Sequence, residues 1–376
     1  MRAVILAGGP SKQLKHVLGY EGSRSLLRFP GRRLLEDLVA EAKRLYDDVV
    51  VVSDDRRVVE ACTYSGCVFA QQVGSGVESA ICAGLSGLAS DTYITIIYGD
   101  IYAAPGFIET HTAKLLSEYE PTITLTRPIV LRGSFMRLSA DPVSSTVEKV
   151  GEGAYVYAGL LSVHSQLLRE KLCSSGWSIE KLVKHLAETR RLVANLWLGT
   201  WIDLDTVWDY LAAVRIDLEK LGKTAISPKA KIGRNVVIEG PVVIEENAVI
   251  DHGAVIKGPA YIGNGAFVGA HSFVRGGSAL YNQARVGAFT EIKRSIVYDN
   301  GVVYSYSYIA DSIIGAGAEV KPYTMTLNVP YEGLEGEVVI MSTHPLEKLK
   351  VGAVVSAGVS TRYRDTLQPA TIYTGQ

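Results

Sequence analysis

The chain has 376 residues, with 38 Lys and Arg against 39 Asp and Glu, and 47% of its residues are hydrophobic. This length predicts two or three domains, each with its own core. The near-zero net charge excludes a general nucleic-acid binder, which needs a basic surface to neutralise phosphates, and the hydrophobic content excludes a disordered chain.

The first apolar run of the chain reaches Gly8 too early for a signal peptide. No stretch approaches the roughly 18 consecutive apolar residues of a membrane-spanning helix. We therefore expect a cytoplasmic chain with no membrane partner.

The four cysteines are Cys62, Cys67, Cys82 and Cys173, and none of them forms a Cys-x-x-Cys pair. Neither a zinc site nor a disulfide framework is indicated by this spacing. Buried thiols are the main interpretation, and a bridge between Cys62 and Cys67 is the alternative.

Up to about residue 220, apolar runs alternate with amphipathic stretches. The sequence predicts strands at 3–6, 49–52 and 93–98 and helices at 34–45, 79–88 and 207–221. Continuous β-branched runs between helices indicate parallel strands buried on both faces, hence an α/β fold with a doubly wound, Rossmann-like sheet. Ligands of such sheets bind beyond the carboxyl ends of the strands.

After Lys223 the sequence repeats every six residues, with an aliphatic residue at the first position and a small one at the fifth. The first positions are Ile226, Ile232, Ile238, Ile244, Ile250, Ile256, Ile262, Val268, Val274, Leu280, Val286, Ile292, Tyr298 and Tyr304. This repeat predicts a left-handed parallel β-helix of about five coils. A loop at about 326–347 and a final, imperfect coil from Val351 follow. We expect two domains, 1–222 and 223–376.

The first predicted strand ends in Leu6-Ala7-Gly8-Gly9. Paired glycines at this place let backbone N–H groups approach a phosphate, although a tight turn at the strand exit explains them equally well. Fourteen residues after Gly9 begins the stretch Ser23–Glu36, Ser-Arg-Ser-Leu-Leu-Arg-Phe-Pro-Gly-Arg-Arg-Leu-Leu-Glu.

Together these stretches resemble the opening motif of the sugar-1-phosphate nucleotidylyltransferases, Ala-Gly-Gly-x-Gly-Thr-Arg-Leu and then Pro-Lys-Pro-Leu-Leu-Pro-x-x-Gly-Lys-Pro-Leu-Leu-Glu. Further matches follow in the family's order at Gly74-Ser75-Gly76, Gly99-Asp100, Glu148-Lys149, Tyr157-Ala158-Gly159 and Trp201-Ile202-Asp203. The second part resembles the β-helical domain of bifunctional nucleotidylyltransferase/acetyltransferases, at 308–315 and 350–353.

The resemblance implies that a sugar 1-phosphate oxygen attacks the α-phosphorus of a nucleoside triphosphate and releases pyrophosphate. It implies Mg²⁺ held by Asp100 and Asp203, with Arg24 as a catalytic cation. The implied nucleotide-binding residues are Leu6, Ala7, Gly8, Gly9, Gln72, Gly74 and Ser75, and the sugar-phosphate residues are Glu148, Lys149 and Gly159. Because both reactants are polyanions, positioning and charge screening suffice without a covalent nucleophile.

Three of these assignments also have a simple structural alternative. Asp203 or Asp205 could simply cap the next helix, and Thr206 with Asp209 also fits a capping box. We assign the metal to Asp203 and the cap to Asp205 or Thr206. Asp100 could simply form a turn. Glu148 and Lys149 could be a solvated charge pair.

The sequence departs from the family pattern in the signature loop, where Ser11, Lys12 and Gln13 replace Gly, Thr and Arg. Losing a bidentate arginine contact costs about 2–4 kcal/mol of transition-state stabilisation unless another cation compensates. We expect Lys12 to be that catalytic cation, with Lys15 and His16 as alternatives. The identity of the base stays open, because the family's base-reading glutamine is replaced by Phe69.

In the second part, Ser305 occupies the place of the histidine that acts as the base in acetyl transfer. We therefore expect nucleotidyl transfer as the function, by a homo-oligomer that is most simply a trimer. The alternatives are a non-catalytic regulatory or assembly subunit and, less well supported, an acetyltransferase on a sugar phosphate, with a histidine such as His252 or His271 as its base.

Overall fold

The computed structural model describes residues 1–9, 11–86, 91–128, 135–329 and 350–375. The chain divides into two compact units. The first unit comprises Met1–Pro10, Ser23–Leu27 and Arg32–Leu204, and the second comprises Ser11–Gly22, Arg28–Gly31 and Asp205–Gln376. Two short segments near the N-terminus and the stretch from Asp205 to residue 222 thus group with the β-helix, whereas the predicted domain limit lies at residue 222.

The first unit is built on a nine-stranded sheet in the order β5-β4-β1-β6-β11-β8-β12-β10-β9. The strands are β1 (Arg2–Leu6), β4 (Asp48–Ser53), β5 (Val68–Gln71), β6 (Tyr93–Tyr98), β8 (Thr122–Thr126), β9 (Arg137–Asp141), β10 (Thr146–Val150), β11 (Tyr155–His164) and β12 (Val193–Trp197). Strands β5, β4, β1 and β6 run parallel, as their β-branched runs predict. Strand β11 is antiparallel to both β6 and β8, so the sheet is mixed.

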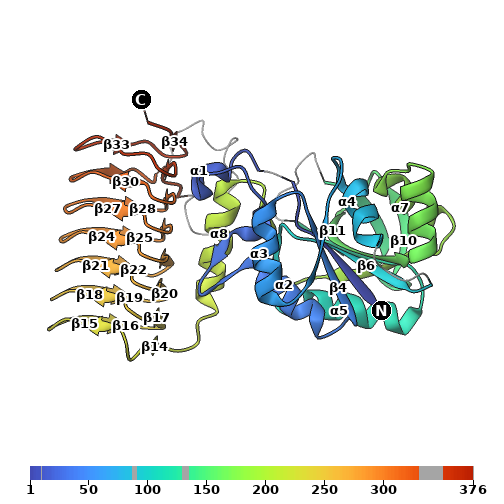
Figure 1. Ribbon diagram of the computed structural model, residues 1–376, viewed down its shortest axis with the longest axis horizontal. Helices are drawn as coiled ribbons and strands as arrows, with labels where there is room; N and C mark the ends of the chain where they lie inside the picture. Colours follow the sequence, from blue (N-terminus) through green and yellow to red (C-terminus); the bar gives the residue numbers. More distant parts are fainter. Residues whose placement is uncertain (10, 87–90, 129–134, 330–349, 376) are drawn as a thin grey trace. The chain divides into compact units, whose positions relative to one another are not determined.

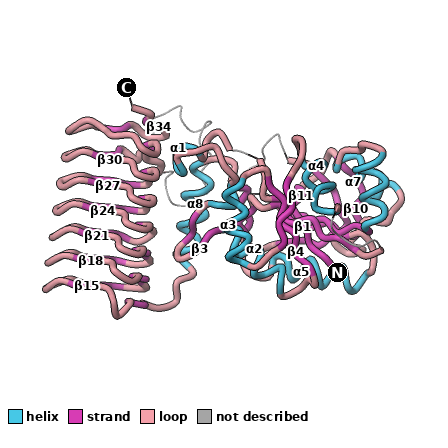
Figure 2. The backbone as a smooth tube through the Cα atoms, in the orientation of Figure 1, coloured by secondary structure: helices cyan, strands magenta, loops and turns pink. Residues whose placement is uncertain are grey.

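Helices cover both faces of this sheet (Figures 1 and 2). The helices of the first unit are η1 (Arg24–Leu26), α2 (Leu34–Lys43), α3 (Arg56–Ser65), α4 (Val77–Leu85), α5 (Phe107–Glu118), α6 (Ser165–Leu168), η2 (Arg169–Ser174) and α7 (Ile179–Glu188). The apolar sides of α4, η2 and α7 share one core with β1, β4 and β6, in which Val4, Ile81 and Leu182 are fully buried. The α/β fold class is confirmed.

The second unit is dominated by the parallel β-helix, drawn as stacked coils in Figure 1. Its first sheet consists of β14 (Ala225–Ile226), β17 (Val242–Ile244), β20 (Ala260–Ile262), β23 (Ser278–Leu280), β26 (Ile296–Val297), β29 (Ile313–Ile314), β32 (Val354–Val355) and β34 (Ile372–Tyr373). The second consists of β15 (Lys231–Ile232), β18 (Val249–Ile250), β21 (Phe267–Val268), β24 (Arg285–Val286), β27 (Val302–Val303) and β30 (Glu319–Val320). The third consists of β16 (Val237–Glu239), β19 (Val255–Lys257), β22 (Phe273–Arg275), β25 (Glu291–Lys293), β28 (Tyr308–Ala310), β31 (Met325–Thr326) and β33 (Thr366–Leu367).

The six-residue repeat holds up to Ile292 and then slips by one residue. Leu280 pairs with Val297, and Val286 pairs with Val303, so these coils contain 17 residues instead of 18. The predicted inward positions Tyr298 and Tyr304 are therefore wrong, and Val297 and Val303 fill the core in their place. The strands continue after the five coils of the repeat through β29–β31, and the final coil expected from Val351 is present as β32–β34. Most of the predicted loop at 326–347 lies outside the described residues.

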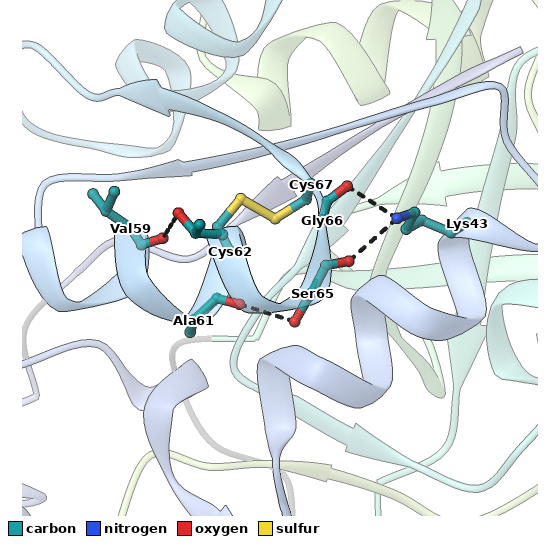
Figure 3. The surroundings of a disulfide bond; sticks show 8 residues. Lys43, Val59, Ala61, Cys62, Ser65, Gly66 and Cys67 are labelled. Carbon is teal, nitrogen blue, oxygen red and sulfur yellow. Dashed lines mark hydrogen bonds between the residues drawn. A yellow bond between two sulfur atoms is a disulfide. The ribbon is translucent and has the colours of Figure 1, made fainter.

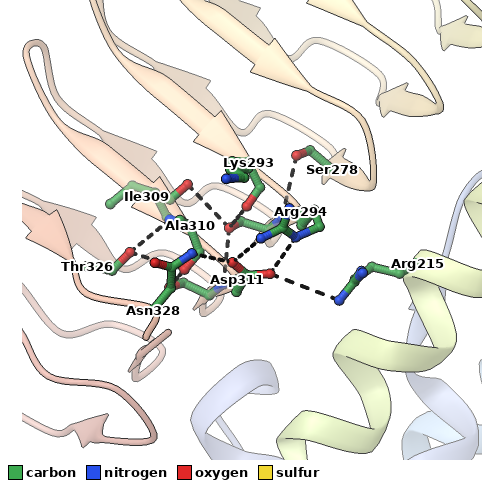
Figure 4. Close-up of polar contacts among 11 residues, drawn as sticks. Arg215, Ser278, Lys293, Arg294, Ile309, Ala310, Asp311, Thr326 and Asn328 are labelled. Atoms are coloured by element: carbon green, nitrogen blue, oxygen red, sulfur yellow. Dashed lines mark hydrogen bonds and ion pairs between the residues drawn. The ribbon is translucent and has the colours of Figure 1, made fainter. Parts of the chain in front are cut away.

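Helix α8 (Val207–Glu219) belongs to the same unit as the β-helix. It begins with the predicted capping box, in which the Thr206 hydroxyl accepts from the Asp209 N–H and the Asp209 carboxylate accepts from the Thr206 N–H. Arg215 on α8 lies 4.0 Å from the buried carboxylate of Asp311 (Figure 4). Arg294 and Asn328 donate to the same carboxylate at 2.6–2.7 Å, so Asp311 joins neighbouring coils to α8.

All four cysteines are oxidised, so the expected buried thiols are wrong. Cys62 pairs with Cys67 (Figure 3), as the alternative interpretation had it, and Cys82 pairs with Cys173. Gly66 ends α3 with φ +67° and turns Cys67 back toward Cys62. The second pair joins α4 to η2 over a separation of 91 residues, and only the tertiary packing of those helices brings the two cysteines together.

A fully buried histidine, His111 on α5, lies in a polar network under the sheet. Its Nδ1 is 2.8 Å from the Thr124 hydroxyl and its Nε2 is 2.7 Å from that of Ser162. Burial lowers the pKa of His111 to about 3, from the ordinary 6.5. The folded protein therefore keeps the ring neutral at every pH above about 3.

His111 is expected to make folding acid-sensitive, because the unfolded chain binds a proton at this ring below pH 6.5 and the folded chain does not. Its contribution to stability is complete above pH 6.5 and falls by about 2 kcal/mol between pH 7.5 and pH 5. Urea unfolding at both pH values measures the fall. His111→Gln should lose that part of the pH dependence, and an equally steep pH dependence in the variant would contradict the assignment.

No helix among the described residues is long and apolar enough to cross a membrane.

Candidate functional site

Arg24 stands at the start of helix η1, directly after the Ser23 N-cap. The Ser23 hydroxyl accepts from the Ser25 N–H, and the Ser23 N–H donates to Asp55 at 3.1 Å. These contacts fix the short turn that presents the Arg24 side chain.

A two-stranded ladder brings Asp100 and Asp203 together. Strand β7 (Ile101–Ala103) pairs antiparallel with β13 (Trp201–Asp203), which places Asp203 opposite Ile101. The Asp100 carbonyl oxygen also accepts from the Leu204 N–H at 3.1 Å. Asp100 and Asp203, which are 103 positions apart in sequence, therefore lie at the same end of this two-stranded ladder.

Arg24 connects these two carboxylates. Its Nη2 lies 2.7 Å from Asp100 Oδ2, and its Nη1 lies 3.8 Å from Asp203 Oδ1. The three side chains are only about a fifth exposed, at 22%, 21% and 17%. The guanidinium balances the two negative charges, which would otherwise repel each other in a partly desolvated site.

A pocket of about 230 Å³ opens beside this cluster at the carboxyl ends of β1 and β6. Its lining residues are Leu6, Gly8, Gly9, Arg24, Gln72, Gly76, Val77, Ala80, Tyr98 and Asp100. Seven of these were matched to the family or assigned to the site from the sequence, namely Leu6, Gly8, Gly9, Arg24, Gln72, Gly76 and Asp100. Burial and the neighbouring Asp100 raise the pKa of Tyr98, so its phenol stays protonated.

Gln72 lies beside the first glycine of the pair. Its Nε2 donates to the carbonyl oxygens of Gly74 and Gly76, at 3.3 and 3.1 Å. A Cβ atom at Gly8 would lie 2.6 Å from Gln72 Oε1, so a larger residue there would displace this amide. The turn at 74–76 thus holds Gln72 with its oxygen toward the glycine pair.

Other residues assigned from the sequence lie around the pocket or outside its lining. The Ala7 N–H donates to Val52, and Ser75 lies in the exposed turn. Gly159 has φ +91°, and a Cβ there would meet the Tyr98 side chain at 3.0 Å. A side chain at this position would meet Tyr98, which gives a packing reason for glycine there; its expected role toward the sugar stays a prediction.

Glu148 and Lys149 do not line the pocket. They lie on β10, where Lys149 donates to Glu152 at 2.7 Å, a contact that raises the pKa of the lysine. Lys12 belongs to the second unit and not to the unit that forms the pocket.

The sequence analysis missed Val77, Ala80 and Tyr98 as lining residues. Val77 and Ala80 are three positions apart on the first turns of α4, so they point to the same side directly after the 74–76 turn. Tyr98 is the last residue of the apolar strand that leads into Gly99-Asp100. Its place at the carboxyl end of a buried strand was the available signal.

In the second unit, Ser305 lies between β27 and β28, where its carbonyl oxygen accepts from the Tyr323 N–H at 3.4 Å. His271 stacks on Phe289, and His252 contacts Asp251.

Comparison with known proteins agrees with this two-part organisation. Residues 3–133 match the family model described as "MobA-like NTP transferase domain", and residues 241–276 match "Bacterial transferase hexapeptide (six repeats)". The chain therefore carries a MobA-like NTP transferase domain followed by hexapeptide repeats. The first match includes the glycine pair, Arg24 and Asp100, so the pocket lies in the nucleotidyltransferase part.

Two relatives align with nearly the whole chain. Proteins named "Bifunctional protein GlmU" from Methanocaldococcus jannaschii and Methanococcus vannielii are each 26% identical to this chain, over 98% of the chain and 91% of the relative. The protein of the same name from Methanococcus aeolicus is 38% identical over 187 residues, which is 50% of this chain and 45% of that protein.

Proposed function

We propose that the protein transfers a nucleotidyl group from a nucleoside triphosphate to a sugar 1-phosphate, with release of pyrophosphate. The observation that carries this proposal is the convergence of Arg24, Asp100 and Asp203 beside Gly8 and Gly9. The bond that breaks and the bond that forms are both phosphoanhydride bonds, so the protein needs to hold two polyanions in line and balance their charge.

The carboxylates of Asp100 and Asp203 fit a divalent cation such as Mg²⁺. Mg²⁺ prefers oxygen ligands and is commonly held by one or two carboxylates together with substrate phosphates. Both carboxylates already converge on one cationic group, that of Arg24. When bound, the ion would stabilise negative charge on the phosphate oxygens.

The remaining pocket residues suit the nucleotide. The backbone of Gly8 and Gly9 and the N-terminus of α4 offer N–H groups and a favourable dipole to the phosphates. Val77, Ala80 and Tyr98 provide an apolar wall, and Gln72 provides a polar edge. Arg24 would then bind phosphate oxygens without moving far from the carboxylates.

We assign Glu148, Lys149 and Gly159 to sugar-phosphate binding only by resemblance, and Lys12 to the phosphate-binding loop. We also propose a cytoplasmic location, where nucleoside triphosphates are available, and a homotrimer formed through the β-helix. Acetyl transfer is not part of the proposal, because Ser305 stands where that reaction is expected to have a histidine as its base.

The test is pyrophosphate release from a panel of nucleoside triphosphates, each combined with several sugar 1-phosphates in the presence of Mg²⁺. We expect release that requires both substrates and stops when the ion is chelated. Release from no pair, with Mg²⁺ or Mn²⁺, would contradict the proposal and favour the non-catalytic subunit.

A further inference from the structure

Two segments of the signature region pack with the β-helix and not with the sheet that forms the pocket. They are Ser11–Gly22 and Arg28–Gly31. The residues between them, Ser23–Leu27, belong to the first unit and include Arg24. The short stretch that carries Arg24 is therefore held on both sides by segments that the β-helix binds.

The first segment is fastened through helix α1 (Lys15–Leu18). Carbonyl groups at the end of a helix have no partner within it, and here the β-helix supplies partners. The N–H groups of Ala316 and Ala357 donate to the carbonyl oxygens of Val17 and His16, both at 2.8 Å. His16 Nδ1 also lies 2.9 Å from the Ser356 hydroxyl.

Glycine at position 315 permits this close contact. A Cβ atom there would clash with the His16 carbonyl oxygen and with the backbone of Ala357. The coil is thus shaped to accept α1.

The second segment is fastened at Arg28, where three buried tyrosines meet. The hydroxyls of Tyr210 and Tyr281 donate to the Arg28 carbonyl oxygen, at 2.5 and 2.8 Å. The Arg28 N–H donates to the Tyr298 hydroxyl at 3.1 Å, and Arg28 Nε donates to Asp299 at 2.6 Å. The N–H, the carbonyl oxygen and the guanidinium of Arg28 are therefore all bound by side chains of α8 and the β-helix.

We propose that the β-helix and α8 position the Arg24 segment for nucleotidyl transfer, through the anchors at His16–Val17 and Arg28. The inference rests on the proposed function and adds a role for the hexapeptide repeats in that reaction. Tyr210, Tyr281 and Tyr298 act through the Arg28 backbone. Ser356 acts through the His16 imidazole, so all four are positioning residues for the segment between them.

The size of the effect follows from the demands of in-line transfer. A displacement of about 1 Å in a group that orients substrate can cost about a hundredfold in rate. Loosening an anchor should lower kcat more than it raises KM, because the pocket itself is left intact.

The test uses the full chain and the double variant Tyr281→Phe/Tyr298→Phe, which removes two hydroxyls and keeps both rings. The matched control is Tyr306→Phe/Tyr323→Phe, the same change at two stacked rings of the β-helix that are 51% and 53% exposed. Ser356→Ala tests the other anchor by itself. For each protein, kcat and KM are measured together with amide hydrogen exchange over residues 23–31.

We expect the anchor variants to lose about tenfold to a hundredfold in kcat, with faster exchange at residues 23–31 and little change in KM. The control should match the parent. Parental kcat in both anchor variants would overturn the inference and leave the proposed function standing.

If the parent releases no pyrophosphate, the proposed function fails, and amide hydrogen exchange alone then tests whether the β-helix positions residues 23–31. Faster exchange confined to residues 23–31 in the anchor variants would still show that the β-helix positions this segment. Unchanged exchange would overturn the inference.

Discussion

Asp100→Asn is expected to lower turnover by a factor of about 10² to 10³ or more, with the fold retained. The neutral amide would be a poor ligand for a divalent cation, and Arg24 would lose the charge pair that it makes with Asp100 at 2.7 Å. Steady-state pyrophosphate release at saturating substrates measures the loss, and thermal unfolding shows whether the variant is folded.

Asp48→Asn is the matched control, because it removes another aspartate that pairs with an arginine. Asp48 contacts Arg2 at 2.9 Å. Both residues lie at the amino ends of their strands, β4 and β1, whereas the pocket lies at the carboxyl ends. Turnover should stay at the parental value there. Parental turnover in Asp100→Asn would remove Asp100 from the proposed metal site.

Replacing Cys82 and Cys173 by alanine is expected to give the largest loss of stability among these variants. Chain-entropy theory gives about 4–5 kcal/mol for a bridge that closes a loop of this length, and about 2 kcal/mol for the short Cys62–Cys67 loop. The longer bridge also ties α4, which lines the pocket, to η2. Urea unfolding of the oxidised proteins measures both losses.

Cys62→Ala/Cys67→Ala is the internal control, since it also removes one disulfide bond, but one that closes a loop of only five residues. Thiol titration of the denatured, unreduced parent should find no free cysteine. Four free thiols would contradict the two disulfides. Equal losses of unfolding free energy in the two double variants would contradict the larger effect of the Cys82–Cys173 bridge.

Much of the pocket could be predicted because it is built from local signals on strands. Gly8, Gly9 and Asp100 each follow an apolar run that ends at the same sheet edge, and parallel strands bring such ends together. Asp203 was found only through the resemblance. Its approach to Asp100 depends on the short β7–β13 ladder, and three-residue strands carry little periodicity of their own.

Features set by tertiary packing escaped the sequence analysis. The Cys82–Cys173 bridge depends on how α4 meets η2, and no spacing rule records that contact. The one-residue slip after Ile292 leaves Tyr298 with a pattern that fits the six-residue repeat, although its ring packs against Tyr210 of α8. Lys12 was assigned to the loop from its position alone, whereas packing groups residues 11–22 with the β-helix.

Nucleotidyl transfer itself can be measured with a nucleoside triphosphate that carries a label at its α-phosphorus. With a sugar 1-phosphate and Mg²⁺ present, we expect the label to move into a nucleotide sugar, and we expect Asp100→Asn to prevent this transfer. Label that stays in the triphosphate with every sugar phosphate, or that moves equally well in Asp100→Asn, would contradict the account.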